Sequence, residues 1–263
     1  MLRKLTAAIV LSGMIAGLAH AGGQPQTGIN GSMHDMNSIT GTTKDIFGRT
    51  CVFCHTPHNA QQTPNTPNAP LWNRADVAAN LVTPYSWSTP ANLSVDGGLT
   101  AALPFADDPL IGPTRLCMSC HDGTIAMDSH RSKGGTAGTQ VMGTSNHAYI
   151  SLDLTVTHPI GFKYTDAVTA RTTSELVPTS VGFLTAPSTS FTATSFNTSS
   201  RGSLTKSSLK IADTLYGGEY MTCATCHDVH NTVNAKSDTG QTYNYFLRAR
   251  EEGSAICLSC HIK

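Results

Sequence analysis

The sequence is poor in the residues from which a large protein core is built. Aromatic residues make up 6% of the 263 positions and apolar residues 39%. Charged residues make up only 13%, and the 17 Lys and Arg balance the 17 Asp and Glu to a formal net charge of zero. A surface that binds nucleic acid needs an excess of basic residues, so we expect no partner of that class. A chain of this composition builds only a thin core of its own.

Long apolar runs are also missing after the N-terminus. Arg3 and Lys4 precede an apolar run over residues 5–18, and a small-x-small triplet, Ala-His-Ala, follows at 19–21. The run is too short to span a bilayer comfortably, and the whole pattern is typical of a cleaved secretory signal. We expect residues 1–21 to be removed and the mature chain to be exported without a membrane or lipid anchor, to an extracellular, cell-surface or periplasmic location. An uncleaved anchor is the alternative.

All eight cysteines fall into one motif, CxxC followed directly by histidine. This is the attachment signature of c-type haem, in which both thiols add to the haem vinyl groups and the histidine takes one axial position on the iron. With 11 histidines in the chain, chance would place one after a given CxxC only about 4% of the time. Zinc sites and disulfides are the alternatives, but neither explains the fixed histidine. The four sites are Cys51, Cys54 and His55; Cys117, Cys120 and His121; Cys223, Cys226 and His227; and Cys257, Cys260 and His261.

The motifs and the composition together predict a fold organised by cofactors. Gly and Pro total 36 residues and are spread along the chain, which disfavours long helices. We expect irregular coil with short α-helices and few short strands, packed around four covalently bound haems. Each CxxCH motif is expected on a short helical turn. The haem propionates would make the assembled protein net acidic.

One segment, residues 165–208, differs from the rest. Ser and Thr fill 21 of its 44 positions, and it contains neither Cys nor His. We expect a solvated loop, with short edge strands or a glycan-bearing surface as alternatives; Asn92 and Asn197 lie in glycosylation triplets, which arise readily by chance. This insertion would interrupt a single tetrahaem domain over 22–263, between one two-haem unit at about 32–130 and another at about 215–263.

Two of the motifs carry an additional histidine. The first reads CVFCHTPHN and the third CATCHDVHN, which places His58 and His230 three residues after the motif histidine, whereas the second and fourth motifs lack this residue. The alternation indicates a duplicated two-haem unit. Residues three apart on a helical turn point to similar sides, but the two axial ligands of one iron approach from opposite faces. We therefore expect His58 and His230 to bind the iron of a neighbouring haem.

Four irons with one motif histidine each leave four further axial positions. His158 precedes Pro159, which restricts it to extended backbone in a stiff loop, and we expect it to be a ligand. His34 lies on an N-terminal arm that iron ligation would tie down, and it completes the expected set. His147 is the first reserve and His130 the second. Methionine is the chemical alternative as an axial ligand, but we expect packing roles for Met33, Met36, Met127 and Met142.

The motifs occur in a familiar order. CVFCHTPHN, PLWNR (70–74), CMSCHDGTIA (117–126), DLTVTHPIGF (153–162), CATCHDVHN and a terminal CLSCH resemble the small tetrahaem c-type cytochromes of metal-reducing bacteria, including those that polymerise into extracellular cytochrome filaments, or nanowires. The resemblance runs from about residue 32 to 261, except across the Ser/Thr-rich segment. It implies bis-histidine haems in a closely packed chain. In filament-forming members, an N-terminal histidine ligates a haem of the neighbouring subunit; His34 matches it by position, with the haem held by His261 as its candidate target.

We therefore expect electron transfer without substrate chemistry, and no enzyme activity. The expected role is the repeating subunit of an extracellular filament, with copies of itself, other redox cytochromes and external acceptors such as metal oxides as partners. A monomeric periplasmic carrier is the main alternative. A multihaem reductase with an open iron site and a structural coat protein are further alternatives, but no CxxCK variant marks such an open site.

Overall fold

The structure is a computed structural model of one chain. It describes residues 29–61, 71–75, 109–171, 175–182, 210–230, 245–248 and 254–262. The expected signal peptide at 1–21, both glycosylation triplets and residues 183–208 of the Ser/Thr-rich segment lie outside these ranges.

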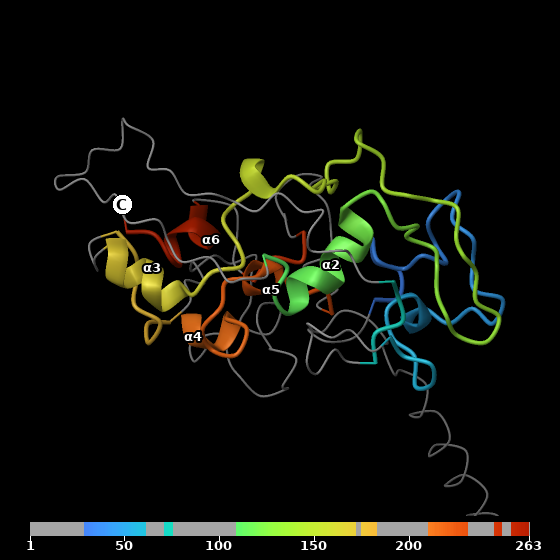
Figure 1. The fold of residues 1–263 in the computed structure, drawn as a ribbon, viewed down its shortest axis with the longest axis horizontal. Helices are drawn as coiled ribbons and strands as arrows, with labels where there is room; N and C mark the ends of the chain where they lie inside the picture. Colours follow the sequence, from blue (N-terminus) through green and yellow to red (C-terminus); the bar gives the residue numbers. More distant parts are fainter. Residues whose placement is uncertain are drawn as a thin grey trace, which may run out of the picture.

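The described chain is mostly irregular backbone with short helices (Figure 1). In the described ranges the longest helix has nine residues and no strand occurs, and pairing there is limited to isolated β-bridges. This confirms the expectation of coil with short helices, while the expected few strands are reduced to bridges in this part of the chain. In chain order the elements are η1 (Cys51–Phe53), α2 (Pro113–His121), η3 (Leu154–Val156), α3 (Tyr164–Arg171), α4 (Ile211–Thr214), α5 (Cys223–Cys226) and α6 (Ala255–Leu258).

Each CxxCH motif lies on a helical turn, as expected. In the first, third and fourth motifs the histidine N–H donates to the carbonyl of the first cysteine, over 2.8, 3.0 and 2.8 Å. The second motif ends the longer helix α2, which starts with Pro113 directly after Gly112, at φ 58°. Proline is favoured at the first position of a helix because its φ is already helical and it has no N–H to leave unbonded. A short helical turn is thus the common frame of all four motifs.

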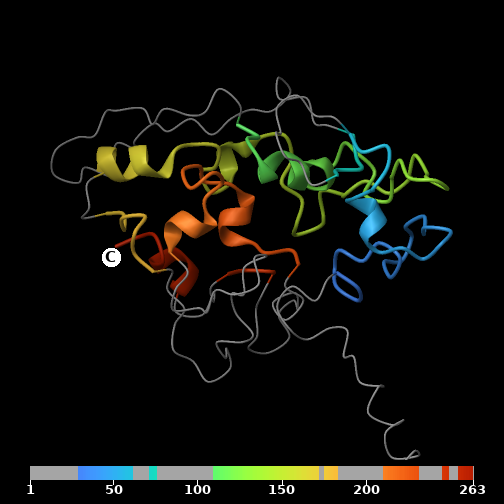
Figure 2. The ribbon, with the colours of Figure 1, turned by 90° about the horizontal axis from the view of Figure 1, so that it is seen from below.

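The motifs are arranged along the long axis of the molecule. Figures 1 and 2 place η1 towards one end, α2 and α5 near the middle, and α6 towards the other end, beside α3 and α4. Helices α2 and α5 are in contact, and so are α4 and α5. The order of the motifs in space therefore follows their order in the sequence.

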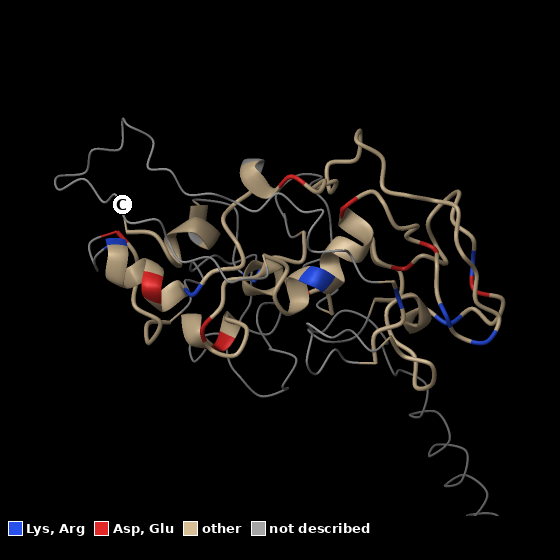
Figure 3. Cartoon of the chain, in the orientation of Figure 1, with Lys and Arg blue, Asp and Glu red and all other residues tan. Residues whose placement is uncertain are grey.

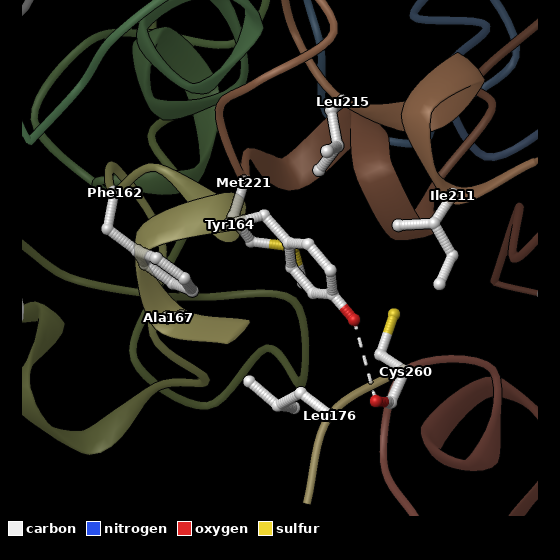
Figure 4. Packing of buried hydrophobic residues seen from close by; sticks show 8 residues of the cluster. All are labelled: Phe162, Tyr164, Ala167, Leu176, Ile211, Leu215, Met221 and Cys260. Carbon is white, nitrogen blue, oxygen red and sulfur yellow. Dashed lines mark hydrogen bonds between the residues drawn. The ribbon is translucent and has the colours of Figure 1, made fainter. Parts of the chain in front are cut away.

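The buried apolar residues form small clusters, and each cluster includes residues of a CxxCH motif. Val52 and Phe53 of the first motif pack with Met36, and Met118 of the second packs with Leu110 and Leu154. The largest cluster, shown in Figure 4, contains Phe162, Tyr164, Ala167, Leu176, Ile211, Leu215, Met221 and Cys260 of the fourth motif. The core is therefore divided among the motifs.

The start of the Ser/Thr-rich segment is not a solvated loop. Residues 164–171 form helix α3, and Ala167 on this helix is 2% exposed and packs in the largest cluster together with Leu176. The expectation is therefore wrong for 165–171 and for residue 176. Serine and threonine counts hide the apolar positions Ala167, Val168 and Leu176, which pack the segment onto the region of the fourth motif.

Charged residues are few along the described chain, and Figure 3 shows several of the basic ones near the end of the molecule that carries η1. Two of the arginines, Arg74 and Arg115, are almost fully buried. None of the helices in the described ranges has the length and hydropathy needed to cross a membrane.

Candidate haem-binding centres

The eight cysteines, all of which are described, are free thiols. Burial raises the pKa of Cys54 to about 12, and the next motif's Cys120 is close enough to contribute to this shift. Burial likewise raises the pKa of Cys226 to about 12, with a contribution from Cys260 of the fourth motif. Thiols with pKa values this high stay protonated at neutral pH. The electrostatic neighbours also show that the first motif lies beside the second, and the third beside the fourth.

The second and third motifs are in direct contact. The backbone N–H of Cys223 donates to the hydroxyl of Thr114 on helix α2, over 3.3 Å. The Cys117 thiol donates a hydrogen bond to the Cys223 sulfur, which raises the pKa of Cys117. The thiol pairs of the four motifs therefore form one continuous row, first to second, second to third and third to fourth.

Two motif histidines make the same hydrogen bond to a backbone carbonyl. Nδ1 of His121 lies 2.7 Å from the carbonyl oxygen of Ala148, and Nδ1 of His227 lies 2.7 Å from that of Tyr245. A carbonyl can only accept, so in both rings Nδ1 carries the proton and Nε2 keeps its lone pair. A metal-binding histidine is typically oriented in this way by a second hydrogen bond. In both rings Nε2 is therefore available to bind a metal.

Three motif histidines face three of the histidines predicted as distal ligands. The ring centres of His55 and His230 are 6.2 Å apart, with the rings 23° from parallel. Those of His34 and His121 are 6.1 Å apart at 77°. The third pair, the fourth motif's histidine at 261 and the predicted ligand at 158, has ring centres 6.2 Å apart at 74°.

This spacing fits two imidazoles on opposite sides of one metal ion. An imidazole nitrogen lies about 2 Å from a bound metal and about 1 Å from its own ring centre, so two axial rings have centres about 6 Å apart. Each pair joins a CxxCH histidine to a histidine from a distant part of the sequence. A porphyrin supplies four further ligands, so two protein nitrogens complete a six-coordinate haem iron. The donor set and its spacing therefore fit a bis-histidine haem at three of the four motifs.

The His34 side chain is partly buried, and its Nδ1 is shielded from solvent. Burial, followed by the nearby rings of His121, His227 and His230, lowers its pKa to about 4, so the ring is neutral at physiological pH. Its Nδ1 has no hydrogen-bond partner among the described residues, and the ring packs against Phe246 at 4.5 Å. A neutral imidazole is the form that binds iron. The single chain thus places His34 against its own second motif, and ligation of a neighbouring subunit stays a prediction.

The other three described histidines outside the motifs are not paired in this way. His58 and His147 are exposed. His130 is buried, with its Nε2 3.6 Å from a carboxylate oxygen of Asp45 and its ring against Phe53 at 5.2 Å. Of the predicted distal ligands, the structure therefore brings His34, His158 and His230 to motif histidines, and it leaves His58 on the surface.

The sequence analysis missed a repeated element behind the first and third motifs, which we call the return segments, residues 71–74 and 245–248. Each crosses back over its motif, with an antiparallel bridge from Trp72 to His55 in one case and from Leu247 to His227 in the other. The segments follow their motif histidines at different separations, so an ungapped comparison does not align them. The pattern CxxCHxxHN, shared by both motifs, indicates that the two units are related. It therefore justifies a comparison, with gaps allowed, of the residues that follow each motif.

Several hydrogen bonds of the two return segments correspond to each other. The backbone N–H of Asn73 donates to the Cys54 carbonyl, and that of Arg248 to the Cys226 carbonyl, both over 2.8 Å. The Asn73 side chain donates to the carbonyl of the residue after the first cysteine, and the Arg248 side chain makes the equivalent bond in the third motif. Leu71 and its counterpart at 246 both have positive φ, at 56° and 59°. The first and third motifs are thus structural copies.

Arg74, which ends the first return segment, connects the first motif to the second. Its buried guanidinium donates to the Ser119 hydroxyl over 3.1 Å and to four backbone carbonyls over 2.6–2.9 Å. Ser119 lies between the cysteines of the second motif, and the other carbonyls belong to Ala126, Met127 and Ser129. The neighbouring Asn73 side chain holds the first motif, so residues 73 and 74 fix two adjacent motifs relative to each other.

Comparison with known proteins adds no assignment: no protein-family model matches the chain, and no curated protein matches it. Within the described ranges, no group of three or more His, Cys, Asp and Glu side chains converges as a site for a bare metal ion.

Proposed function

We propose that this protein transfers electrons through four covalently attached c-type haems, each held by its CxxCH histidine and by a second histidine. The observation that carries the proposal is the pairing of three motif histidines with three distant histidines at 6.1–6.2 Å between ring centres. A bound haem supplies one-electron chemistry at its iron. The chain supplies the tethering thiols, the axial nitrogens and the orientation of the rings.

The residues favour electron transfer over catalysis. Ligands on both axial sides would leave no position for a substrate, and the ring centres of His34, His158 and His230 lie 6.1–6.2 Å from those of motif histidines. The carbonyls of Ala148 and Tyr245 fix the rings of two motif histidines, which keeps the ligands in place. Rigid ligation of this kind lowers the structural change that accompanies gain or loss of an electron.

The row of motifs supports movement of electrons along the molecule. Neighbouring motifs are close enough for their thiols to influence one another, and the second and third are hydrogen-bonded. Cofactors tethered to this row would be closely spaced, which fast hopping requires. The first and fourth motifs lie towards opposite ends, and Cys51 and Cys257, the first cysteine of each, are exposed.

The end positions also favour a finer proposal, that the protein is the repeating subunit of an extracellular cytochrome filament. A subunit with a cofactor near each end can pass electrons to the next copy through a head-to-tail contact that does not close into a ring. The same ends would serve a monomeric periplasmic carrier that meets other redox cytochromes or, outside the cell, metal oxides. Electron microscopy of protein sheared from its native cells separates the two: ordered haem-containing filaments support the subunit, and only small particles support the carrier.

The haem assignment is tested on protein produced with a c-type haem attachment system. We expect a mass increase of four haems and an electron paramagnetic resonance spectrum of the oxidised protein that contains low-spin iron only. Bound zinc, disulfides in place of thioethers, or fewer than four haems would overturn the assignment. A high-spin component that responds to added small ligands would instead indicate an open iron site and support a reductase.

A further inference from the structure

We propose that the first and third motifs exchange their additional histidines: His230 serves the haem held by His55, and His58 serves the haem held by His227. The chain would then supply all eight axial ligands by itself. This inference rests on the proposed function and specifies which histidine completes which site. Its starting point is the observed pair of His55 and His230, in which the additional histidine of the third motif faces the first motif.

The third motif is the one whose histidine has no assigned partner among the described pairs. Every histidine of the chain except His20 lies in the described ranges, so the candidates can be enumerated. After the three pairs are removed, only His58, His130 and His147 remain for the haem of His227. The ligand must be the one of these three that can reach the third motif.

His130 and His147 are held next to other motifs. The His130 side chain is fully buried between Asp45 and Phe53, and Phe53 belongs to the first motif. His147 directly precedes Ala148, whose carbonyl holds the ring of His121 in the second motif. The His130 side chain is therefore held at the first motif, and the backbone next to His147 at the second.

His58 is presented by the same local turn as His230. The backbone N–H of His58 lies 3.4 Å from the Thr56 hydroxyl, and that of His230 lies 3.3 Å from an Asp228 carboxylate oxygen, so in each copy the residue two positions earlier supports the histidine. The backbone N–H of that earlier residue is in turn bonded to the return segment, over 2.9 Å in the first copy and 2.7 Å in the third. The two presenting loops are thus equivalent.

In an isologous contact between two equivalent units, each contact is matched by its symmetry-related pair, and we take the first and third copies to be related in this way. The third copy places its additional histidine on the motif histidine of the first copy. Reciprocity therefore assigns the additional histidine of the first copy, His58, to His227. His58 is exposed and its ring makes no hydrogen bond to a described residue, so its loop can turn inward without breaking a side-chain contact.

The test measures the spin state of the iron in His58→Ala, with His147→Ala as the matched control because this histidine is also exposed and unpaired. We expect about one quarter of the iron in His58→Ala to become high-spin and to return to low-spin with added imidazole, and no change in His147→Ala. A second variant, His58→Met, keeps an axial donor and should raise the reduction potential of one haem without creating high-spin iron. An all-low-spin His58→Ala protein, with four haems attached, would overturn the exchange and leave the proposed function standing.

The partner of His58 is identified in a variant without the third haem, Cys223→Ala/Cys226→Ala. In that background the addition of His58→Ala should create no new high-spin iron, whereas the addition of His230→Ala should still create it at the first haem. New high-spin iron from His58→Ala in this background would overturn the assignment. So would a high-spin fraction in the wild-type monomer that disappears as the concentration is raised, because this would assign the missing ligand to a second copy. Failure of the proposed function is distinct, since it shows as missing haems in the wild type.

Discussion

Replacement of Arg74 should destabilise the protein more than replacement of any exposed arginine. The Arg74 side chain is 1% exposed and all five of its N–H groups are bonded, to the Ser119 hydroxyl and to four carbonyls. Arg74→Met leaves these acceptors buried without a donor, at a cost of about 1 kcal/mol each. Relief of the desolvated charge offsets part of this, so we expect a loss of about 4 kcal/mol in the free energy of unfolding.

The assay is guanidinium chloride unfolding of the haem-loaded protein, followed by circular dichroism. Arg131→Met is the matched control, because Arg131 is exposed and its side chain is hydrogen-bonded to the side chain of Gln61 at the surface. We expect this control to change stability by less than about 0.5 kcal/mol. A loss for Arg74→Met that does not exceed the control would show that the five hydrogen bonds do not hold the first two motifs together, and would refute the reasoning.

Three other predictions concern local features. Hydrogen bonds from Arg49 lower the pKa of Asp45 to about 2. The ionised carboxylate therefore stabilises the fold above about pH 4, and this contribution is lost as the pH falls through 2. The melting temperature of Asp45→Asn should therefore change less than that of the wild type between these two pH values. Gly123→Ala should cost more than about 1 kcal/mol in thermal unfolding, because its Cβ would lie 2.5 Å from the Tyr149 ring, whereas Gly217→Ala, with similar positive φ and open space, should cost less. Protein made without haem attachment should show no cooperative unfolding transition, since the apolar clusters are small; a sharp transition in that sample would contradict this.

The sequence was sufficient for the local frame of the motifs but not for their pairing. CxxCH predicts a helical turn because the two cysteines and the histidine must project towards one cofactor, and all four turns are present. The sequence also singled out His34, His158 and His230, which face motif histidines. Which motif each one faces depends on contacts between segments far apart in the chain, and no local pattern encodes them. His58 shares the CxxCHxxHN pattern with His230 and yet lies on the surface.

Two further features escaped prediction for different reasons. The return segments are recognised only by their hydrogen bonds, because LWNR and YFLR share little beyond an apolar pair and a polar or basic residue after it. Helix α3 was hidden by composition, since a count of Ser and Thr ignores the spacing of Ala167 and Val168 on one helix. In both cases the tertiary contact, and not the residue type, decided the structure.

The distance in sequence between paired histidines has a consequence for how the chain is held together. If the three observed pairs bind iron as proposed, they close loops of about 90, 175 and 100 residues, between 34 and 121, 55 and 230, and 158 and 261. Each closure would act as a cross-link and remove freedom from the unfolded chain, worth about 5 kcal/mol for loops of this length in the chain-entropy treatment of disulfides. These cross-links overlap, because 55 lies inside the first loop and 158 inside the second. A chain with little apolar core would thus obtain from coordination bonds the topological constraint that small exported proteins obtain from disulfides.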